Sequence, residues 1–550
     1  MQFEFRYAGE SQVHSGSQQT AMNFIPDALR EPTYFKGELA NPLAFREAIS
    51  ALNSVVVSDL RMKKKDRSEY LEWAQKRDIE ELNQLQSLTP KVQEQLQRVE
   101  VELGQLRNKI KTFNIPFLNA QRKYFDYLYK NDRQLWILLD PVISIHPDEL
   151  FFECFSKDES TYARLACDYQ QFQKIGEFAC GTTNIDYSHA LYREFQKLRS
   201  YRTTQLQVDP GGFQVQTEKS DAFTEVKIDL PDSWVRGFLQ VSAAMTLPAN
   251  VFQLHPMDLA NICLFLRRHK EKHGPRSLRF QLKPHQPVRL VFEPWNTELV
   301  CRRSIYHGPE NEVRFWGRRR LLVLERLIPW AKSIQVHLTG TGLPSFFAVD
   351  LDGMVFTLGL SGWTANDWSR CGHFSLLSSR IQVDSSTRQR VHAALKKAWF
   401  ASVTDLSKSL NIDQALVASS LQAYTQAGRV MFDINKGVYR LRELSREPLP
   451  LEKLRFSSEA ESKATQILDN GQASLGEVRT SEAQTVLKGT VQEKQKIFQV
   501  EAIINADLAL TKATCQCDFY VRNKLYRGPC PHILALRMAF QRDQRAAVSL

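Results

Sequence analysis

Three cysteines and one histidine near the C-terminus constrain this chain more than any other feature. Cys515 and Cys517 flank a single residue, and Cys530 and His532 form a similar pair after a polar spacer, residues 518–529. Thiolate sulfur and imidazole nitrogen are the ligands of tetrahedral zinc, at about 2.0–2.3 Å from the ion. Because four protein ligands leave no position for water or substrate, the motif predicts one structural Zn2+ ion and not a catalytic one.

The residues on either side of the motif predict strands before it and a helix after it. Residues 496–505 and 508–510 are apolar and rich in β-branched side chains, which is typical of strands. On such an extended chain the thiols of Cys515 and Cys517 point the same way, because strand side chains alternate with period two. Residues 531–542 are predicted to be a helix, with Pro531 in its first turn, where a missing N–H costs nothing.

This arrangement resembles the SWIM zinc finger, whose signature is Cys-x-Cys, a variable spacer and Cys-x-His, with strands before and a helix after. The resemblance covers residues 475–545, and all four ligand positions are filled. The alternative is that the four residues meet the pattern by chance or form disulfides. The wider chain is similar to bacterial SWIM zinc-finger proteins at residues 318–321, 342–346 and 356–368.

The resemblance implies a protein that binds DNA or protein partners through its SWIM module. It also implies, more weakly, a scaffold or adaptor that works beside a MoxR-type AAA+ ATPase and a von Willebrand factor A partner. If the partner is a nucleic acid, DNA is favoured over RNA. We expect no small-molecule substrate and no membrane partner.

Composition sets broad limits on the class of protein. A chain of 550 residues has room for roughly three or four domains. No stretch of about 18 apolar residues occurs, and the first residues carry no apolar signal-peptide segment. Scattered cysteines in such a chain are expected to be reduced and buried, which favours a cytoplasmic protein; they are Cys154, Cys167, Cys180, Cys263, Cys301 and Cys371.

Basic residues are clustered along the chain, whose net charge is +11. Dense groups occur at 63–65, 267–276 and 318–320. If such groups converge on one face they attract nucleic-acid phosphates; otherwise they are solvated helix faces. In the spacer of the metal motif, the candidate contact residues for phosphates or an acidic partner are Arg522, Lys524 and Arg527.

The first part of the chain is predicted to be helical. A folded lead-in, residues 1–60, contains a helix at 43–52. Residues 61–113 form a helical coiled-coil region, with apolar positions that alternate spacings of four and three between 92 and 110. An antiparallel hairpin is favoured there over a self-associating coiled coil. Residues 114–208 are predicted to be an aromatic-rich helical domain.

Two α+β domains are predicted next, at 209–310 and at 311–385, and the second has Gly/Ser-rich loops. Its run from His337 through Asp350 or Asp352 to residues 361–366 faintly resembles a phospholipase D-type half-site. Thr339 stands where that family has a lysine, so the phosphate-binding cation is missing. The segment is therefore interpreted as a relic or a binding pocket, and a degenerate nuclease is a minor alternative.

Residues 387–443 read as a winged helix. Helices are predicted at 388–400, 405–410 and 414–426, capped by Thr404 and Asp413, followed by a hairpin with its turn at 435–437. In DNA-binding versions the helix at 414–426 would enter the major groove, but it carries no cation. Cations lie instead on the predicted wing, so the alternative is a packing module; the candidate contacts are Arg429, Lys436 and Arg440.

The sequence therefore predicts an α+β multidomain protein with an N-terminal helical region, central α+β domains, a winged-helix-like module and a C-terminal SWIM zinc finger. No Walker A motif, dinucleotide fingerprint, His-Glu-x-x-His or Gly-x-Ser-x-Gly occurs. We accordingly expect no enzymatic activity and no catalytic residues. The only cofactor expected is one structural Zn2+.

Overall fold

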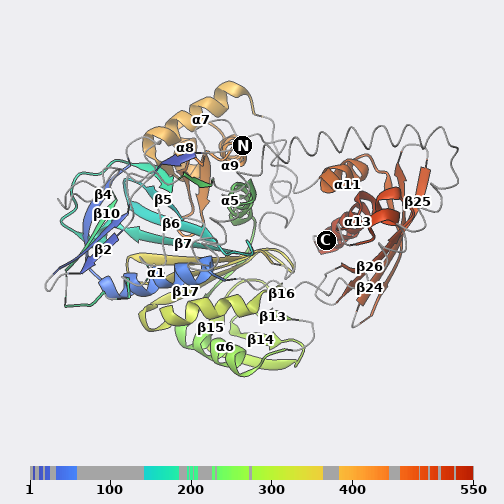
Figure 1. Ribbon diagram of the computed structural model, residues 1–550, viewed down its shortest axis with the longest axis horizontal. Helices are drawn as coiled ribbons and strands as arrows, with labels where there is room; N and C mark the ends of the chain where they lie inside the picture. Colours follow the sequence, from blue (N-terminus) through green and yellow to red (C-terminus); the bar gives the residue numbers. More distant parts are fainter. Residues whose placement is uncertain are drawn as a thin grey trace, which may run out of the picture. The chain divides into compact units, whose positions relative to one another are not determined.

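The computed structural model describes most of the chain outside residues 59–140 (Figure 1). The chain divides into two units, residues 1–59 with 139–550 and residues 60–138, and only the first contains described residues. The predicted coiled-coil region and Arg527 lie outside them. No helix among the described residues is long and apolar enough to cross a membrane. The described ranges are 4–6, 12–15, 19–24, 33–58, 141–184, parts of 192–208, 226–228, 232–271, 276–362, 383–444, 459–481, 484–493, 496–505, 510–525 and 528–548.

The largest sheet in the described part of the chain is eight-stranded and antiparallel, with strand order β12-β17-β18-β19-β7-β6-β5-β9. Because its strands come from three of the predicted domains, the boundaries expected at 208 and 310 do not separate independent folding units. The strands are β5 (Val142–Ile145), β6 (Glu149–Phe155), β7 (Thr161–Asp168), β9 (Gly181–Asn184), β12 (Asn250–Leu254), β17 (Ser333–Leu338), β18 (Ser345–Asp350) and β19 (Met354–Leu360).

The prediction of a helical domain at 114–208 is wrong for its described part, where the chain forms strands β5 to β10. Every residue of β6 is buried, including Glu149 and Glu153, so the segment lacks the alternation of apolar and polar side chains that marks a half-exposed strand. Such a segment cannot be distinguished from a buried helix by periodicity. Helix α1 (Pro42–Val56) contacts β6 and β7, with Phe45 and Phe152 ring centroids 6.3 Å apart. This helix confirms the one predicted at 43–52.

A second antiparallel sheet, β15-β14-β13-β16, is accompanied by helix α6 (Pro256–Arg268) and the 3₁₀ helix η2 (Arg318–Trp330). The basic group at 318–320 is mostly structural. Arg318 and Arg320 are buried, and each has a guanidinium nitrogen 3.3 Å from a carboxylate, on Glu271 and Asp158 respectively. The strands are β13 (Ser277–Leu282), β14 (Gln286–Phe292), β15 (Thr297–Tyr306) and β16 (Asn311–Trp316).

The N-terminal residues contribute to two further sheets. A five-stranded sheet has the order β2-β3-β10-β4-β8, and β1 pairs with β11. Helix α5 (Asp232–Met245) follows β11. The strands are β1 (Glu4–Arg6), β2 (Gln12–Ser15), β3 (Gln19–Phe24), β4 (Phe35–Leu39), β8 (Phe172–Gln173), β10 (Thr203–Val208) and β11 (Val226–Ile228).

The helices and hairpin predicted between 387 and 443 are present. The shortest helix begins earlier than expected, because Ser402 and not Thr404 caps it: the Ser402 hydroxyl accepts the N–H of Asp405 at 3.0 Å. Asp413 caps the next helix as predicted. The elements are α7 (Ser385–Ala398), β20 (Phe400–Ala401), α8 (Val403–Leu410), α9 (Gln414–Gln426), β21 (Val430–Asp433) and β22 (Val438–Leu441).

The C-terminal region is a four-stranded antiparallel sheet, β23-β24-β25-β26, with helices packed on one face. Gly489 lies where α13 crosses the sheet: a Cβ added there would meet Leu536 Cδ1 and the Ser474 carbonyl oxygen at 2.4 Å each. A larger residue would require Leu536 to move and would collide with the backbone of the neighbouring strand β23. The elements are α11 (Glu459–Asp469), β23 (Ala473–Thr480), β24 (Gln484–Glu493), β25 (Lys496–Asn505), β26 (Leu510–Cys515), α12 (Asp518–Asn523) and α13 (Pro531–Val548).

Candidate metal centre

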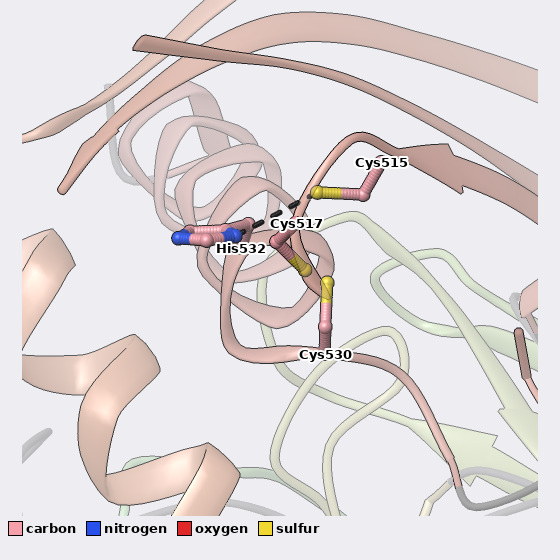
Figure 2. A group of neighbouring side chains, drawn as sticks. All are labelled: Cys515, Cys517, Cys530 and His532. Atoms are coloured by element: carbon pink, nitrogen blue, oxygen red, sulfur yellow. Dashed lines mark hydrogen bonds between the residues drawn. The ribbon is translucent and has the colours of Figure 1, made fainter. Parts of the chain in front are cut away.

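The four predicted ligands come together from three adjacent elements of the C-terminal region. Cys515 ends β26, Cys517 caps α12, and Cys530 immediately precedes α13, whose second residue is His532. Figure 2 shows the three thiols and the imidazole directed toward one another. The strand at 496–505 is β25 as predicted, and Pro531 begins the final helix as predicted. The spacer, expected to be a loop, contains the short helix α12.

The geometry of the four side chains fits one tetrahedral metal ion. Their ligand atoms all lie within 4.8 Å of one another. The Cys515 sulfur is 3.6 Å from Nδ1 of His532. An ion at about 2.3 Å from sulfur and about 2.05 Å from nitrogen, with a tetrahedral angle, separates those two atoms by about 3.6 Å. The side chains could therefore bind an ion with little rearrangement.

The cluster is part of the core of this region and not a surface feature. Cys530 is fully buried, and the other three side chains are at most 7% exposed. Cys517 also accepts the N–H of Tyr520 at 3.4 Å. Hydrogen bonds with the Cys515 and Cys530 thiols, together with that N–H, hold the pKa of Cys517 well below its ordinary value. Hydrogen bonds with Cys515 and Cys517 raise the pKa of Cys530 above its ordinary value, so Cys517 is the thiol that is favoured as a thiolate, which is the form that binds metal.

His532 is oriented by two residues that the sequence analysis did not identify. Its Nε2 lies 3.1 Å from Oε2 of Glu493, at the end of β24, and its ring stacks on Phe498 with centroids 4.4 Å apart. Burial lowers the pKa of His532, but hydrogen bonds with Cys515 and Cys517 raise it to about 10. Metal binding must therefore displace a proton from Nδ1. No spacing in the sequence points to Glu493, because the sheet register brings it to the site.

The candidate contact residues next to the metal centre lie on α12 and just after it. Arg522 is exposed, and Nζ of Lys524 lies 5.2 Å from the Tyr520 ring centroid. Two apolar side chains of the same helix are also exposed, Phe519 by 37% and Val521 by 51%. The helix therefore presents cations and apolar side chains together.

Two of the cations predicted on the wing, Arg440 and Lys436, pair with carboxylates of residues 148–149, whereas Arg429 is in a half-exposed pair. Arg440 is fully buried, with Nε 2.8 Å from Oδ2 of Asp433 and Nη1 2.9 Å from Oδ1 of Asp148. Nζ of Lys436 is 2.7 Å from Glu149 Oε2, and Arg429 is 3.7 Å from a carboxylate oxygen of Glu443. The geometry gives no support to Arg440 and Lys436 as contact residues, because their charges are already neutralised against β5–β7.

The helix expected to read DNA is also covered. Helix α9 contacts α5, α7, α8 and β21, and only its first residues, Gln414 and Ala415, are exposed. Because α5 lies outside this module and contacts both α9 and β21, this side of the module packs in part on the rest of the chain.

The residues of the faint phospholipase D-like pattern do not converge. His337 pairs with Phe346 in the β17–β18 ladder, whereas Asp350 pairs with Ser333 at the other end. Four residues of strand separate the histidine from that end, which is about 13 Å. Burial lowers the pKa of His337 to about 4, so its imidazole is neutral and core-facing. Residues 363–366 lie outside the described part of the chain.

Comparisons with known proteins identify no family. No protein-family model matches the chain, and no curated protein matches it. A solved structure that it resembles is Proliferating Cellular Nuclear Antigen from Entamoeba histolytica, at 10% sequence identity and a TM-score of 0.33. That match covers 60% of this chain and 98% of the other. A likeness at this level carries no argument about fold or function.

Proposed function

We propose that this chain is a non-enzymatic zinc protein whose C-terminal SWIM-type module binds nucleic acid, with DNA favoured over RNA. Cys515, Cys517, Cys530 and His532 would hold one structural zinc, since three thiolates and one imidazole suit that ion best. All four positions are taken by protein side chains, so the metal stabilises the fold and leaves no position for a substrate.

The observation that carries the proposal is the coupling of α12 to the metal ligands. The helix is capped by Cys517, and it presents exposed Phe519, Val521 and Arg522, with Lys524 directly after it. Aromatic side chains beside cations suit single-stranded nucleic acid, because bases stack on rings while cations meet phosphates. Zinc binding would fix this short helix in place.

A protein-binding scaffold is the second candidate, and one observation favours it. The cations expected to make the winged-helix-like module a DNA reader are paired with carboxylates inside the protein. That module then serves as a packing unit or a protein-binding unit. The cytoplasmic location predicted from the sequence agrees with either candidate.

Nucleic-acid titrations of the full-length, zinc-loaded chain would test the proposal. Single-stranded and duplex DNA would be titrated between about 50 and 200 mM salt, where each phosphate contact lowers affinity through counterion release. The variant Arg522→Ala/Lys524→Ala should lose most of the affinity for DNA. The slope of its log binding constant against log salt concentration should fall by the amount expected for about two lost phosphate contacts.

The matched control is Lys488→Ala/Lys512→Ala. Both lysines are exposed, and they alternate with the core-facing residues Leu487 and Ala513. The control removes the same charge from the opposite face of the sheet and should bind as the wild type does. Equal losses in the two double variants, or no DNA binding by a zinc-loaded protein, would rule out the proposed interface.

A further inference from the structure

The 385–441 module carries an apolar groove that is lined only by residues of this module in the described part of the chain. The groove has a volume of about 630 Å3 and lies between α7 and α8. Its lining is mainly apolar, with Ala394, Ala398, Phe400, Leu406 and Leu410, and its charged members are Lys397 and Asp405. A concave surface lined mainly by carbon is the usual form of a binding site.

The floor of the groove is held firmly by the packing beneath it. Phe400 and Ala401 form β20, which pairs with β22 at Arg440 and Tyr439. The Arg440 guanidinium lies over the Phe400 ring, 5.0 Å from its centroid, and that arginine is anchored to Asp148 and Asp433. Because the hairpin is fixed, the groove is already formed before anything binds, which reduces the entropic cost of binding.

The surface around the groove is strongly cationic. Residues 384–410 contain five cations, Arg388, Arg390, Lys396, Lys397 and Lys408, and two carboxylates, Asp384 and Asp405. Both carboxylates bind at the starts of their own helices, to Thr387 N and to the Ser402 hydroxyl. In the described part of the chain none of the five cations lies within ion-pair distance of a carboxylate.

One of these cations marks the end of the groove. Nη2 of Arg390 donates to the carbonyl oxygen of Leu410 at 3.1 Å, which bridges α7 and the last residue of α8. Arg390, Ala394, Lys397 and Ala398 follow the i, i+4, i+7, i+8 spacing of one helix face. Positive charge therefore stands at two points along an apolar cleft.

We propose that the groove between α7 and α8 binds a short acidic segment of a partner protein, whose apolar side chains enter the groove and whose carboxylates face Lys397 and Arg390. A nucleic acid fits the groove less well, because the groove is lined mainly by apolar side chains and phosphates require hydrogen-bond donors. A second copy of this chain would bring like charges together. The proposal goes beyond nucleic-acid binding at the zinc module and uses different elements.

A peptide selection on the full-length, zinc-loaded chain tests this. A random peptide library displayed on phage would be selected on the wild type and counter-selected on Ala398→Arg. Ala398 is exposed and lines the groove, so an arginine fills the space while it adds positive charge. Enriched peptides should combine Asp or Glu with Leu, Ile or Phe and should not bind the variant. Basic or random enriched sequences, or peptides that still bind the variant, would overturn the proposal.

The affinity of the selected peptide for two charge-reversal variants provides the sharper comparison. Lys397→Glu should raise its Kd at least about tenfold, whereas Lys396→Glu, the same charge change on a residue that does not line the groove, should have a much smaller effect. Equal effects would show general electrostatic attraction and reject the groove. Cys517→Ser should keep peptide binding, which separates this proposal from the zinc-dependent one. Thermal melts of the two charge-reversal variants would confirm that they are folded.

Discussion

Glu493 lies behind His532, with its Oε2 3.1 Å from Nε2, while Nδ1 of the same ring faces the Cys515 sulfur at 3.6 Å. The carboxylate therefore fixes the tautomer in which Nδ1 is available for the metal. Carboxylates in this position are usual partners of metal-binding histidines. The end of the β24 strand is thus coupled to the metal centre.

Removal of this carboxylate should weaken metal binding without removing a ligand. We expect Glu493→Ala to lower the zinc affinity by about 10–100-fold, which is typical for partners of ligating histidines. Competition with a chromophoric chelator would measure it. Glu501→Ala, on the neighbouring strand β25, is the control and should keep the wild-type affinity. An unchanged affinity in Glu493→Ala would mean that Phe498 and the helix alone orient the ring.

Removal of a ligand should have a larger and local effect. Cys517→Ser is expected to abolish stoichiometric zinc and to unfold the C-terminal region, since zinc contributes about 10–16 kcal/mol of apparent binding energy in small fingers. Residues 1–440 should remain folded. Metal analysis and hydrogen exchange would follow the two effects. The control is Cys180→Ser, at a half-exposed thiol outside the cluster, which should change neither the zinc content nor the folding of the C-terminal region. Stoichiometric zinc in Cys517→Ser would contradict the ligand assignment.

The close approach of α13 to its sheet gives a prediction about packing. In Gly489→Ala the new methyl group would meet the Ser474 carbonyl oxygen and Leu536. Overpacking of this kind costs about 1–3 kcal/mol. Hydrogen exchange should therefore become faster in β24 and α13, and zinc should be released more readily to a chelator. Lys488→Ala, the preceding residue on the other face of the strand, should have little effect on either measurement.

The metal centre could be predicted from the sequence because all of its ligands lie within a short segment. Cys515, Cys517, Cys530 and His532 are local in sequence, and their spacing carries the chemistry. The hairpin and helices around Asp413 and residues 435–437 were predictable for the same reason, because caps and turns are local signals.

The contacts that depend on tertiary structure could not be predicted. Arg440 and Lys436 look like surface cations in the sequence, and only the packing of the β21–β22 hairpin against the eight-stranded sheet shows that they neutralise Asp148, Asp433 and Glu149. The buried strand β6 likewise lacks the alternation that identifies a half-exposed strand. Glu493 reaches His532 only through the register of β24.

The ion pairs under the hairpin should behave as one unit. Arg440 and Asp433 are both buried. Loss of either leaves the other with its remaining partners, Arg164 for Asp433 and Asp148 for Arg440, so each removal should cost less than the roughly 3–5 kcal/mol of an isolated buried pair. We expect Arg440→Met and Asp433→Leu each to loosen the hairpin. The double variant should cost clearly less than the sum of the two. Hydrogen exchange over residues 430–441 would measure the loss of stability in the two single variants and in the double variant. Strict additivity of these losses would show that the two side chains act independently.

Acid should loosen the same interface through His146. Its ring is fully buried and packs against Phe151 and Trp399. Burial, followed by the charge of Arg440, lowers the pKa of His146 to about 3. Between about pH 6.5 and pH 3 the His146 imidazole is protonated in the unfolded chain but neutral in the folded chain. The free energy of unfolding therefore falls as the pH falls.

The stability lost through His146 between about pH 7.5 and pH 5 should be about 2 kcal/mol, at 1.36 kcal/mol per pH unit below 6.5. His146→Leu should remove this part of the pH dependence, measured by hydrogen exchange in residues 142–146 and 430–441. His337, whose pKa burial lowers to about 4, acts with the same sign, so His337→Leu should leave the part that depends on His146 intact. If His146→Leu and the wild type lose the same stability on acidification, proton uptake by another group must open the hairpin.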